Sequence, residues 1–202
     1  MLTVVCVLKT GGEYSAHYVK KLMDGIKNNL TIEYRFICLS DIELDFCETL
    51  PLLNDYPGWW SKLELFRFKD KTLYFDLDTV INGSLDEIAS FDHHFTMLQD
   101  FQPYGRDLMP GVYGSGVMAW QGDFSYLLDE FTTAEILNYN TTGKWGDQGW
   151  IRDKLNQVPD TFQTLFPAMF ASHKWHPKQT RLNASVVCYH GKPRPHETGW
   201  IV

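Results

Sequence analysis

The sequence contains no long apolar run and little positive charge. No stretch of its 202 residues approaches the about 18 consecutive apolar residues that a membrane-spanning helix needs. Lysine and arginine number 18 against 25 acidic residues, so the formal net charge is −7, and no basic run could neutralise a nucleic-acid backbone. We therefore expect no transmembrane segment and no nucleic-acid partner. To bind an anionic small molecule, so acidic a protein would need a local positive group, such as a metal ion, a lysine or backbone amides.

Paired cysteines are missing as well. The chain has four cysteines, Cys6, Cys38, Cys47 and Cys188, and none has the close paired spacing of a zinc or redox site. We expect reduced, mostly buried thiols. The first eight residues lack the positively charged region of a signal peptide and predict a strand instead.

Apolar periodicity predicts alternating strands and helices along the chain. Apolar runs predict strands over 2–8, 32–39, 72–76, 95–99, 116–120, 161–166 and 184–189. Apolar residues spaced three and four apart, together with N-cap signals, predict helices over 14–30, 59–68, 123–137 and 146–155 and a short helix after Ser84. Residues 40–57 resemble an excursion that ends in turn signals. Because strands and helices alternate, we expect one α/β domain over 1–202 with three layers, a mostly parallel central sheet and late antiparallel additions. This domain is either a minimal protein or one domain of a longer one.

Two carboxylates follow the predicted strand at 72–76. Asp76 and Asp78 are spaced i, i+2 at the point where a strand would open into a loop. Ligands of open α/β sheets gather outside the carboxyl ends of strands, and oxygen ligands suit hard cations such as Mg²⁺ or Mn²⁺. The pattern is short, so two solvated acids are an equally good interpretation of this pair alone. A glycosylation sequon begins at Asn82, and because a glycan there would crowd the site, we expect a cytoplasmic location.

Three further segments place polar residues at the ends of apolar elements. They are Ser61-Lys62-Leu63, Gly146-Asp147-Gln148-Gly149 and His190-Gly191-Lys192-Pro193. In order and spacing, these segments, the stretch from Leu73 to Ile88 and Gly114-Ser115-Gly116-Val117-Met118 together resemble glycosyltransferase family 8, the glycogenin and galactosyltransferase-like enzymes. Each motif alone is short, but five in register make the resemblance specific.

The resemblance implies a GT-A fold, a Rossmann-like α/β/α domain that transfers a hexose from a sugar nucleotide, usually a UDP-sugar, to a hydroxyl acceptor. It implies that Asp76, Asp78 and His190 hold Mn²⁺ or Mg²⁺. It also implies that Lys62 and Lys192 face the diphosphate and donor sugar, and that Asp147 and Gln148 face the reacting sugar. The remaining donor contacts implied are Leu8, Lys9, Thr10, Leu77, Asp100 and Gly191.

The chain departs from the family at two places. Lys192-Pro193 follows His190 almost directly, and Tyr113-Gly114-Ser115-Gly116 stands where family members often have Phe-Asn-Ser-Gly. The identity of the donor is therefore open. Family members retain the anomeric configuration, which favours front-side attack, with the leaving phosphate accepting the acceptor's proton; inversion with Asp147 or Asp107 as base is the alternative. Trp145 and Trp175, in polar loops, are candidates for the acceptor side.

Two other functions fit parts of the sequence. Residues 75–80 also resemble the nucleophile motif of haloacid dehalogenase-type phosphatases, with Asp76 as nucleophile and Asp147 and Asp153 as distal acids. That motif usually ends the first strand of its domain, whereas two strands are predicted before it here. A binding module for sugar nucleotides without catalytic activity is the second alternative, and the intact acidic pair and His190 argue against it.

Overall fold

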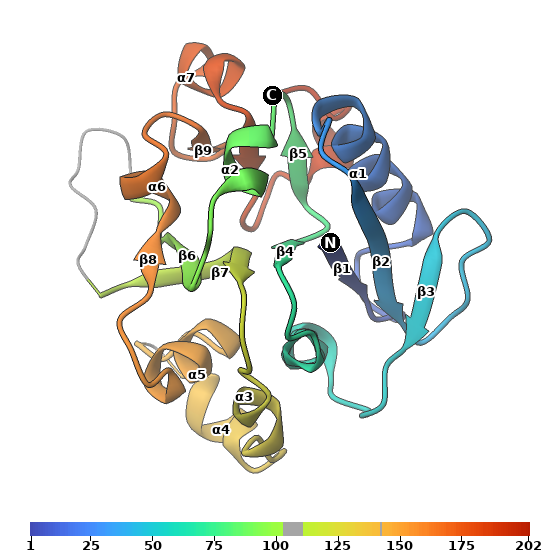
Figure 1. Ribbon diagram of the computed structural model, residues 1–202, viewed down its shortest axis with the longest axis vertical. Coiled ribbons are helices and arrows are strands. Elements are labelled where there is room, and N and C mark those ends of the chain that lie inside the picture. The colour runs from blue at the N-terminus through green and yellow to red at the C-terminus, as the bar shows by residue number, and fades with distance from the viewer. Residues whose placement is uncertain (103–110, 142) are drawn as a thin grey trace.

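The protein is described by a computed structural model that covers residues 1–102, 111–141 and 143–202. A seven-stranded sheet with the order β3-β2-β1-β4-β7-β6-β8 runs through its middle, and helices cover both faces (Figure 1). This architecture is the predicted three-layer α/β domain with a mostly parallel central sheet. No helix within the described ranges is long and apolar enough to cross a membrane.

The first half of the sheet is wholly parallel. It contains β1 (Leu2–Leu8), β2 (Tyr34–Ser40), β3 (Glu48–Pro51) and β4 (Thr72–Phe75), with α1 (Ala16–Asn29) connecting β1 to β2. β1 pairs with β2 on one side and β4 on the other, so it is an interior strand of the sheet. Its carboxyl end therefore lies beside that of β4, where the acidic pair begins.

The second half of the sheet is mixed. The strand β7 (Tyr113–Trp120) runs antiparallel between β4 and β6 (Phe95–Gln99), and the short β8 (Asp160–Thr161) lies parallel to β6. Because β7 runs in the opposite direction, its amino-terminal end meets the carboxyl ends of β4 and β6. The glycine-rich start of β7 is thereby brought to the acidic pair.

Directly after the acidic pair, the chain enters a small second sheet of three strands. It contains β5 (Thr79–Ile81), β10 (Val186–Cys188) and β9 (Phe170–Ser172), with β10 antiparallel to β5 and parallel to β9. The segment after β10 therefore returns to the residues that precede β5. The backbone N–H of Tyr189 donates to the carbonyl of Asp78 at 3.1 Å, which fixes this return.

Side-chain alternation along β1 divides the core between the two faces of the sheet. Val4 and Cys6 pack on α1, α2 (Asp86–Ser90), α6 (Phe162–Leu165) and the small sheet, whereas Val5 faces the opposite layer. That layer contains the 3₁₀ helix η1 (Gly58–Arg67), α3 (Tyr126–Asp129), α4 (Glu135–Tyr139) and α5 (Asp147–Lys154). The remaining elements, α7 (Lys178–Asn183) and the 3₁₀ helix η2 (Pro195–Thr198), lie near the chain's end.

Two predicted elements were wrong. The expected strand over 161–166 is mostly the helix α6, because Phe162 and Phe166 are both buried at a spacing of four, the period of a helical turn. The expected helix over 123–137 is split into α3 and α4. Between these two helices the buried ring of Phe131 stacks on Trp60 at 4.8 Å, and two β-branched threonines follow it.

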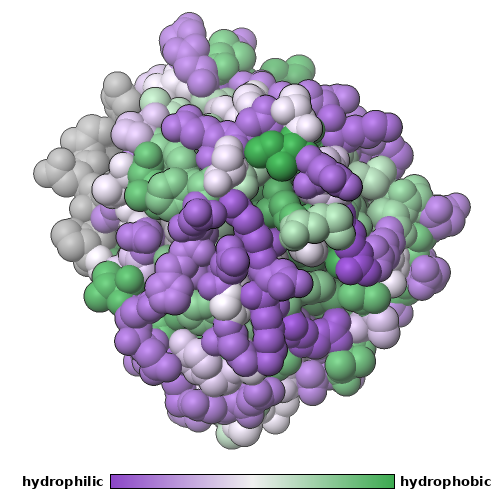
Figure 2. All heavy atoms as spheres, viewed as in Figure 1, coloured by the Kyte–Doolittle hydropathy of each residue, from purple (hydrophilic) through white to green (hydrophobic). Residues whose placement is uncertain are grey.

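Several other predictions hold within a few residues. The strands β1 and β6 have the predicted bounds, and the thiols of Cys6, Cys38 and Cys188 are free and buried, while Cys47 is half-buried. The excursion at 40–57 contains the edge strand β3, which the sequence pattern did not indicate. The outer surface seen in Figure 2 is largely hydrophilic, with scattered apolar side chains.

Candidate functional site

A cavity of about 620 Å³ opens at the edge of the sheet where β1, β4 and β6 end and β7 begins. Its lining includes nine of the predicted site residues, which are Lys9, Lys62, Asp76, Leu77, Asp78, Asp100, Asp147, Gln148 and His190. Segments that are more than a hundred positions apart in the chain therefore meet around one cavity. This is the position at which ligands of open α/β sheets bind.

Lys62 is the buried centre of one side of the cavity. Its Nζ lies 3.1 Å from Asp76 Oδ1 and 3.1 Å from Asp147 Oδ2, and the side chain is only 8% exposed. The hydroxyl of Ser115 accepts from the same Nζ at 3.1 Å and donates to Asp147 Oδ2 at 2.6 Å. Tyr74 also donates its hydroxyl to Asp76. One ammonium group thus fixes two carboxylates that arrive from β4 and α5.

Backbone geometry places Asp76 in this network. The backbone N–H of Asp76 donates to the carbonyl of Gly116 at 2.8 Å, so the residue continues the pairing of β4 with β7. A Cβ atom at Gly116 would lie 3.3 Å from Asp76 Oδ2, so a side chain at that position would crowd the carboxylate. The glycine in the Gly114–Gly116 segment therefore lets β7 approach the acidic pair closely.

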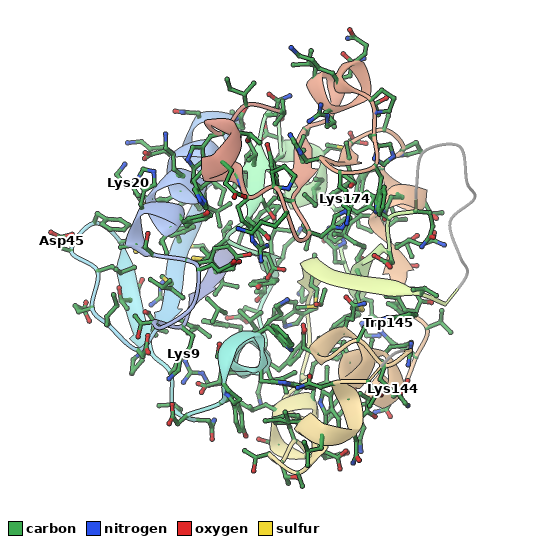
Figure 3. All side chains as sticks on the ribbon, turned by 180° about the vertical axis from the view of Figure 1, so that it is seen from behind. Lys9, Lys20, Asp45, Lys144, Trp145 and Lys174 are labelled. Atoms are coloured by element: carbon green, nitrogen blue, oxygen red, sulfur yellow. The ribbon has the colours of Figure 1, made fainter. Side chains whose placement is uncertain are left out.

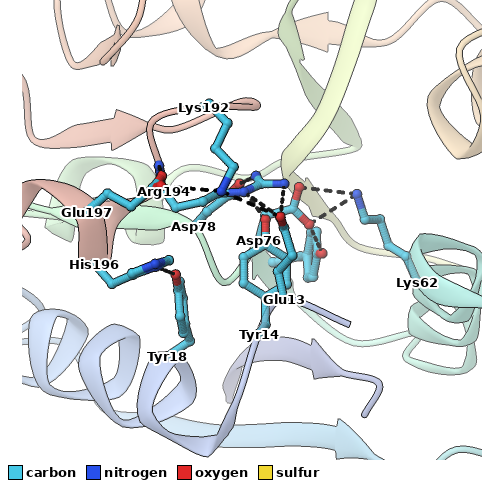
Figure 4. Close-up of polar contacts among 11 residues, drawn as sticks. Glu13, Tyr14, Tyr18, Lys62, Asp76, Asp78, Lys192, Arg194, His196 and Glu197 are labelled. Atoms are coloured by element: carbon cyan, nitrogen blue, oxygen red, sulfur yellow. Dashed lines mark hydrogen bonds and ion pairs between the residues drawn. The ribbon is translucent and has the colours of Figure 1, made fainter. Parts of the chain in front are cut away.

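Asp78 is held by a different set of groups. Tyr14 donates its hydroxyl to Asp78 Oδ2 at 2.7 Å, and Arg194 Nη1 donates to the same oxygen at 2.7 Å. The carboxylate is almost fully buried, and the guanidinium lies above the ring of Tyr14 at 5.3 Å. Figure 4 shows Arg194 and Lys62 approaching the acidic pair from opposite sides.

The pKa shifts follow from burial and from the proximity of these charges. Burial, and then the negative charge of Asp76, raise the pKa of Asp78 to about 7, against the opposing effects of Tyr14 and Arg194. Burial also raises the pKa of Asp76 above its usual range. Burial disfavours the charged form of Lys62, but Asp147 and Asp76 outweigh it, so the pKa of the ammonium is raised and it stays charged.

His190 lines the same cavity on the side of the small sheet. Its Nε2 lies 2.6 Å from the hydroxyl of Ser172, and its ring stacks on Phe101 with centroids 5.9 Å apart. Burial, helped by the charge of Lys174 and by His176, lowers the pKa of the imidazole to about 4, so it is neutral, as a metal ligand must be. Over 1–102, 111–141 and 143–202, no three His, Cys, Asp or Glu side chains are grouped closely enough to hold a metal ion by themselves.

Four predicted donor contacts lie outside the cavity lining. Leu8 is buried in the core, and Thr10 donates its backbone N–H and its hydroxyl to Asp41 at 2.9 and 2.8 Å. Gly191 is not among the lining residues. Lys192 has a side chain that is 65% exposed and pairs with Glu197 at 3.3 Å. The structure therefore does not bring these four residues to the cavity.

Several cavity residues were not predicted from the sequence. They are Glu13, Tyr14, Trp59, Tyr74, Ser115 and Arg194. The alternation of side chains along 72–76 puts Tyr74 and Asp76 on the same face and could have indicated that contact. Nothing in the local sequence indicates that residues 14 and 194 meet at Asp78, because only the tertiary fold joins them.

Two tryptophans stand at the cavity with substantial exposure. Trp145 is 45% exposed and Trp59 is 59% exposed, and both line the cavity. Figure 3 shows Trp145 beside Lys144, ahead of α5, on the opposite side of the view from Lys9. A Cβ atom at Gly146 would lie 2.8 Å from Trp59 Nε1, so a side chain there would push the indole away. Trp175, by contrast, packs near the ring of His190 at 6.2 Å and is not among the lining residues.

The geometry does not favour the phosphatase alternative. Three strands precede β4, and Asp147 begins α5 instead of ending an apolar strand. Asp153 is not in the cavity lining; its carboxylate pairs with Arg152 at 2.8 Å and also with Lys144. The alternative base Asp107 lies outside the described residues.

The fold has clear structural relatives. Glycosyltransferase GlyE of Streptococcus pneumoniae TIGR4 superposes with a TM-score of 0.68 at 14% identity, over 96% of this chain and 56% of GlyE. The galactosyltransferase LgtC, in complex with donor and acceptor sugar analogues, gives a TM-score of 0.62 at 14% identity, over 96% of this chain and 88% of LgtC. An LgtC active-site mutant with a glutamine changed to glutamate gives 0.62 at 12% identity.

These similarities establish the fold, a GT-A type α/β domain shared with glycosyltransferases. The chain spans just over half the length of GlyE but most of LgtC. No protein-family model matches the sequence. No curated protein sequence matches it either.

Proposed function

We propose that this chain is a glycosyltransferase of the family 8 type, which moves a hexose from a nucleoside-diphosphate sugar to a hydroxyl acceptor. The observation that carries the proposal is the cavity itself, in which the acidic pair, Lys62, Asp147 and Gln148 meet at the carboxyl edge of a GT-A sheet. A UDP-sugar is the favoured donor, and retention of configuration the favoured outcome, because the five motifs resemble retaining enzymes.

The charge of the cavity supports a divalent cation as part of the site. Among the described residues, the lining has five acidic side chains, Glu13, Asp76, Asp78, Asp100 and Asp147, and three cations, Lys9, Lys62 and Arg194. An anionic diphosphate would be repelled by this excess of negative charge. The donors fit Mn²⁺ or Mg²⁺ in chemical type, since Asp76 and Asp78 offer carboxylate oxygens and His190 offers a neutral nitrogen in the same cavity. A cation bound there would offset the negative charge that develops on the departing diphosphate.

The side chains of this chain then have separate roles. Lys62 fixes the orientation of Asp76 and Asp147 and adds a positive charge near the phosphates. Asp147 and Gln148, at the start of α5, face the space where the transferred sugar would lie. In LgtC an active-site glutamine has been changed to glutamate, which agrees with a role for a glutamine such as Gln148. Asp100 would contact donor hydroxyls from the end of β6.

The acceptor would enter past the exposed indoles. Trp145 and Trp59 present flat apolar surfaces at the cavity, and such surfaces suit the apolar faces of sugars. A carbohydrate acceptor is therefore favoured over a small alcohol. A reducing compartment such as the cytoplasm fits the four free thiols.

The test is a thermal-shift panel followed by a hydrolysis assay. UDP-, GDP-, CMP- and dTDP-sugars are each added with Mn²⁺ or with a chelator, and a bound donor raises the melting temperature. We expect a UDP-sugar with Mn²⁺ to give the largest shift, slow release of free sugar from that donor, and loss of both in Asp78→Ala. Asp86→Ala, on the surface at the start of α2, is the control for loss of a carboxylate.

Three results would contradict the proposal in different ways. If no sugar nucleotide stabilises the protein under any metal condition, donor binding is wrong. Binding without hydrolysis or transfer to any acceptor would favour the non-catalytic module. Turnover of phosphate monoesters with an aspartyl-phosphate trapped on Asp76 would establish the phosphatase.

A further inference from the structure

Arg194 lies directly against the carboxylate of Asp78, one of the two acidic residues proposed to bind a metal ion. Its Nη1 lies 2.7 Å from Asp78 Oδ2, and the side chains of the two residues are only 18% and 9% exposed. The pair is therefore largely shielded from water, which strengthens the attraction between its charges. A divalent cation bound to the same oxygen would stand within a few ångströms of the guanidinium, and two cations at that separation repel each other.

A second anion holds the guanidinium in place. Arg194 Nε lies 2.8 Å and Nη2 lies 2.6 Å from Glu13 Oε2, so Glu13 and Asp78 share one cation (Figure 4). If Asp78 were taken by a metal ion, Arg194 would keep Glu13 as a partner and stay at the cavity. The displaced guanidinium would not have to leave for solvent.

The segment that carries Arg194 is anchored independently of Asp78. Pro195 is buried, the ring of His196 packs against Tyr18 at 5.9 Å, and Trp200 packs on the same tyrosine at 4.8 Å. The backbone can therefore stay in place while the Arg194 side chain changes partners. Lys62, by contrast, has little freedom to change partners, because its buried ammonium group is enclosed by two carboxylates and a hydroxyl.

We propose that Arg194 is an internal counter-cation, which neutralises Asp78 when no metal ion is bound and which a divalent cation must displace in order to bind. The inference rests on the proposed function, because it presumes a metal ion at the acidic pair. Two consequences follow. The metal ion binds weakly to the protein alone, and its binding is strengthened by an anionic ligand, such as a nucleoside diphosphate, that takes over the freed guanidinium.

The test measures Mn²⁺ binding directly, without any assay of activity. Mn²⁺ is titrated into wild type, Arg194→Met and the control Arg152→Met by calorimetry, and the free ion is counted by electron paramagnetic resonance. Arg152 pairs with Asp153 at 2.8 Å and is not among the cavity-lining residues, so its loss changes net charge without freeing Asp78. We expect at least about tenfold tighter Mn²⁺ binding in Arg194→Met, the scale of one shielded ion pair, and less than about twofold change in the control.

A second titration examines the coupling. With saturating UDP as the probe, we expect Mn²⁺ affinity to rise at least about tenfold in wild type and by clearly less in Arg194→Met, since that variant has no guanidinium to release. Melting curves establish that each variant is folded. If Arg194→Met does not fold, Arg194→Gln replaces it, because glutamine keeps a polar side chain without the charge.

The possible results separate the two proposals. Equal Mn²⁺ affinity in wild type and folded Arg194→Met or Arg194→Gln overturns the counter-cation and leaves the metal site standing. Tighter binding in Arg152→Met to the same extent also overturns it, because net charge would then explain the effect. Absence of Mn²⁺ binding by every variant, with and without UDP, overturns the metal part of the proposed function and this inference with it.

Discussion

Asp76 and Asp78 are two positions apart, yet different parts of the molecule hold them. Asp76 is bound by Lys62 of η1 and Tyr74 of β4, which are only 14 and 2 positions away in the chain. Asp78 is bound by Tyr14 and Arg194, which are 64 and 116 positions away in the chain. The carboxylate of Asp76 is therefore held by residues close to it in the chain, whereas that of Asp78 is held by two distant segments. Adjacent residues in one motif can thus differ in how freely they exchange partners.

The largest effect on stability is expected from Lys62→Met. The change leaves the buried Asp147 and the partly exposed Asp76 without their common cation, which should lower the free energy of unfolding by about 3–5 kcal/mol. Urea denaturation measures the loss. The control is Lys69→Met, because Lys69 and its partner Asp123 are each 56% exposed and their pair should contribute at most about 1 kcal/mol. Similar small losses in both variants would show that Lys62 is not a structural centre.

Gly149→Ala should destabilise the protein by displacing the backbone beside Asp147, on the Lys62 side of the cavity. A Cβ atom at Gly149 would lie 1.7 Å from the carbonyl oxygen of Lys144, so the loop that leads to Asp147 must move. Such overpacking costs about 1–3 kcal/mol. Gly12→Ala is the matched control, since nothing lies within 4 Å of a Cβ there. Equal stability of the two variants by urea denaturation would contradict the close approach.

Removing the hydroxyl of Tyr74 or of Tyr14 tests how strongly each of the two carboxylates is held. Each donates a hydroxyl to one carboxylate, Tyr74 to Asp76 and Tyr14 to Asp78. Tyr74→Phe should cost about 2 kcal/mol, because Tyr74 is buried and water cannot replace its hydroxyl at Asp76. Tyr14→Phe should cost about 1 kcal/mol, because Tyr14 is only half-buried and water can take over part of its hydrogen bond. Chemical denaturation of both variants measures the difference. The reverse order would mean that Asp78, and not Asp76, is the more rigidly held of the pair.

Trp145→Ala should have the smallest effect on stability and act on the acceptor alone. Because Trp145 is 45% exposed, we expect a change in unfolding free energy within about 0.5 kcal/mol. With an acceptor that supports transfer, KM for that acceptor should rise while hydrolysis of the donor stays unchanged. Leu137→Ala, at an exposed position outside the cavity lining, is the control. An unchanged acceptor KM would remove Trp145 from the acceptor side.

The sequence was most informative where local signals and position in the fold agree. The apolar run before Asp76 predicted a strand that ends in a carboxylate, and the start of α5 at Asp147 was predicted to within one residue. These signals are local, because they depend on periodicity and on the ends of elements. The helix that carries Lys62 was predicted over 59–68 and is found as η1 over Gly58–Arg67, although the element is a 3₁₀ helix and not an α-helix.

The rest of the site depends on contacts that no local pattern encodes. Arg194 was overlooked in favour of Lys192, because the resemblance pointed to a lysine and only the path of the chain after β10 turns Arg194 toward Asp78. The segment at 161–166 was misassigned because a short apolar run fits either a strand or a helical turn. In both cases tertiary packing decided between two locally acceptable structures.

The contact between residues 14, 78 and 194 also bears on the order in which the molecule folds. During synthesis the parallel half of the sheet and the Lys62 network up to Asp76 can form while residue 194 has yet to be made. Asp78 gains its guanidinium only when the chain through η2 has closed over a loop of 116 positions. Because contacts between distant segments form slowly, we expect the cavity to be completed after the parallel half of the sheet.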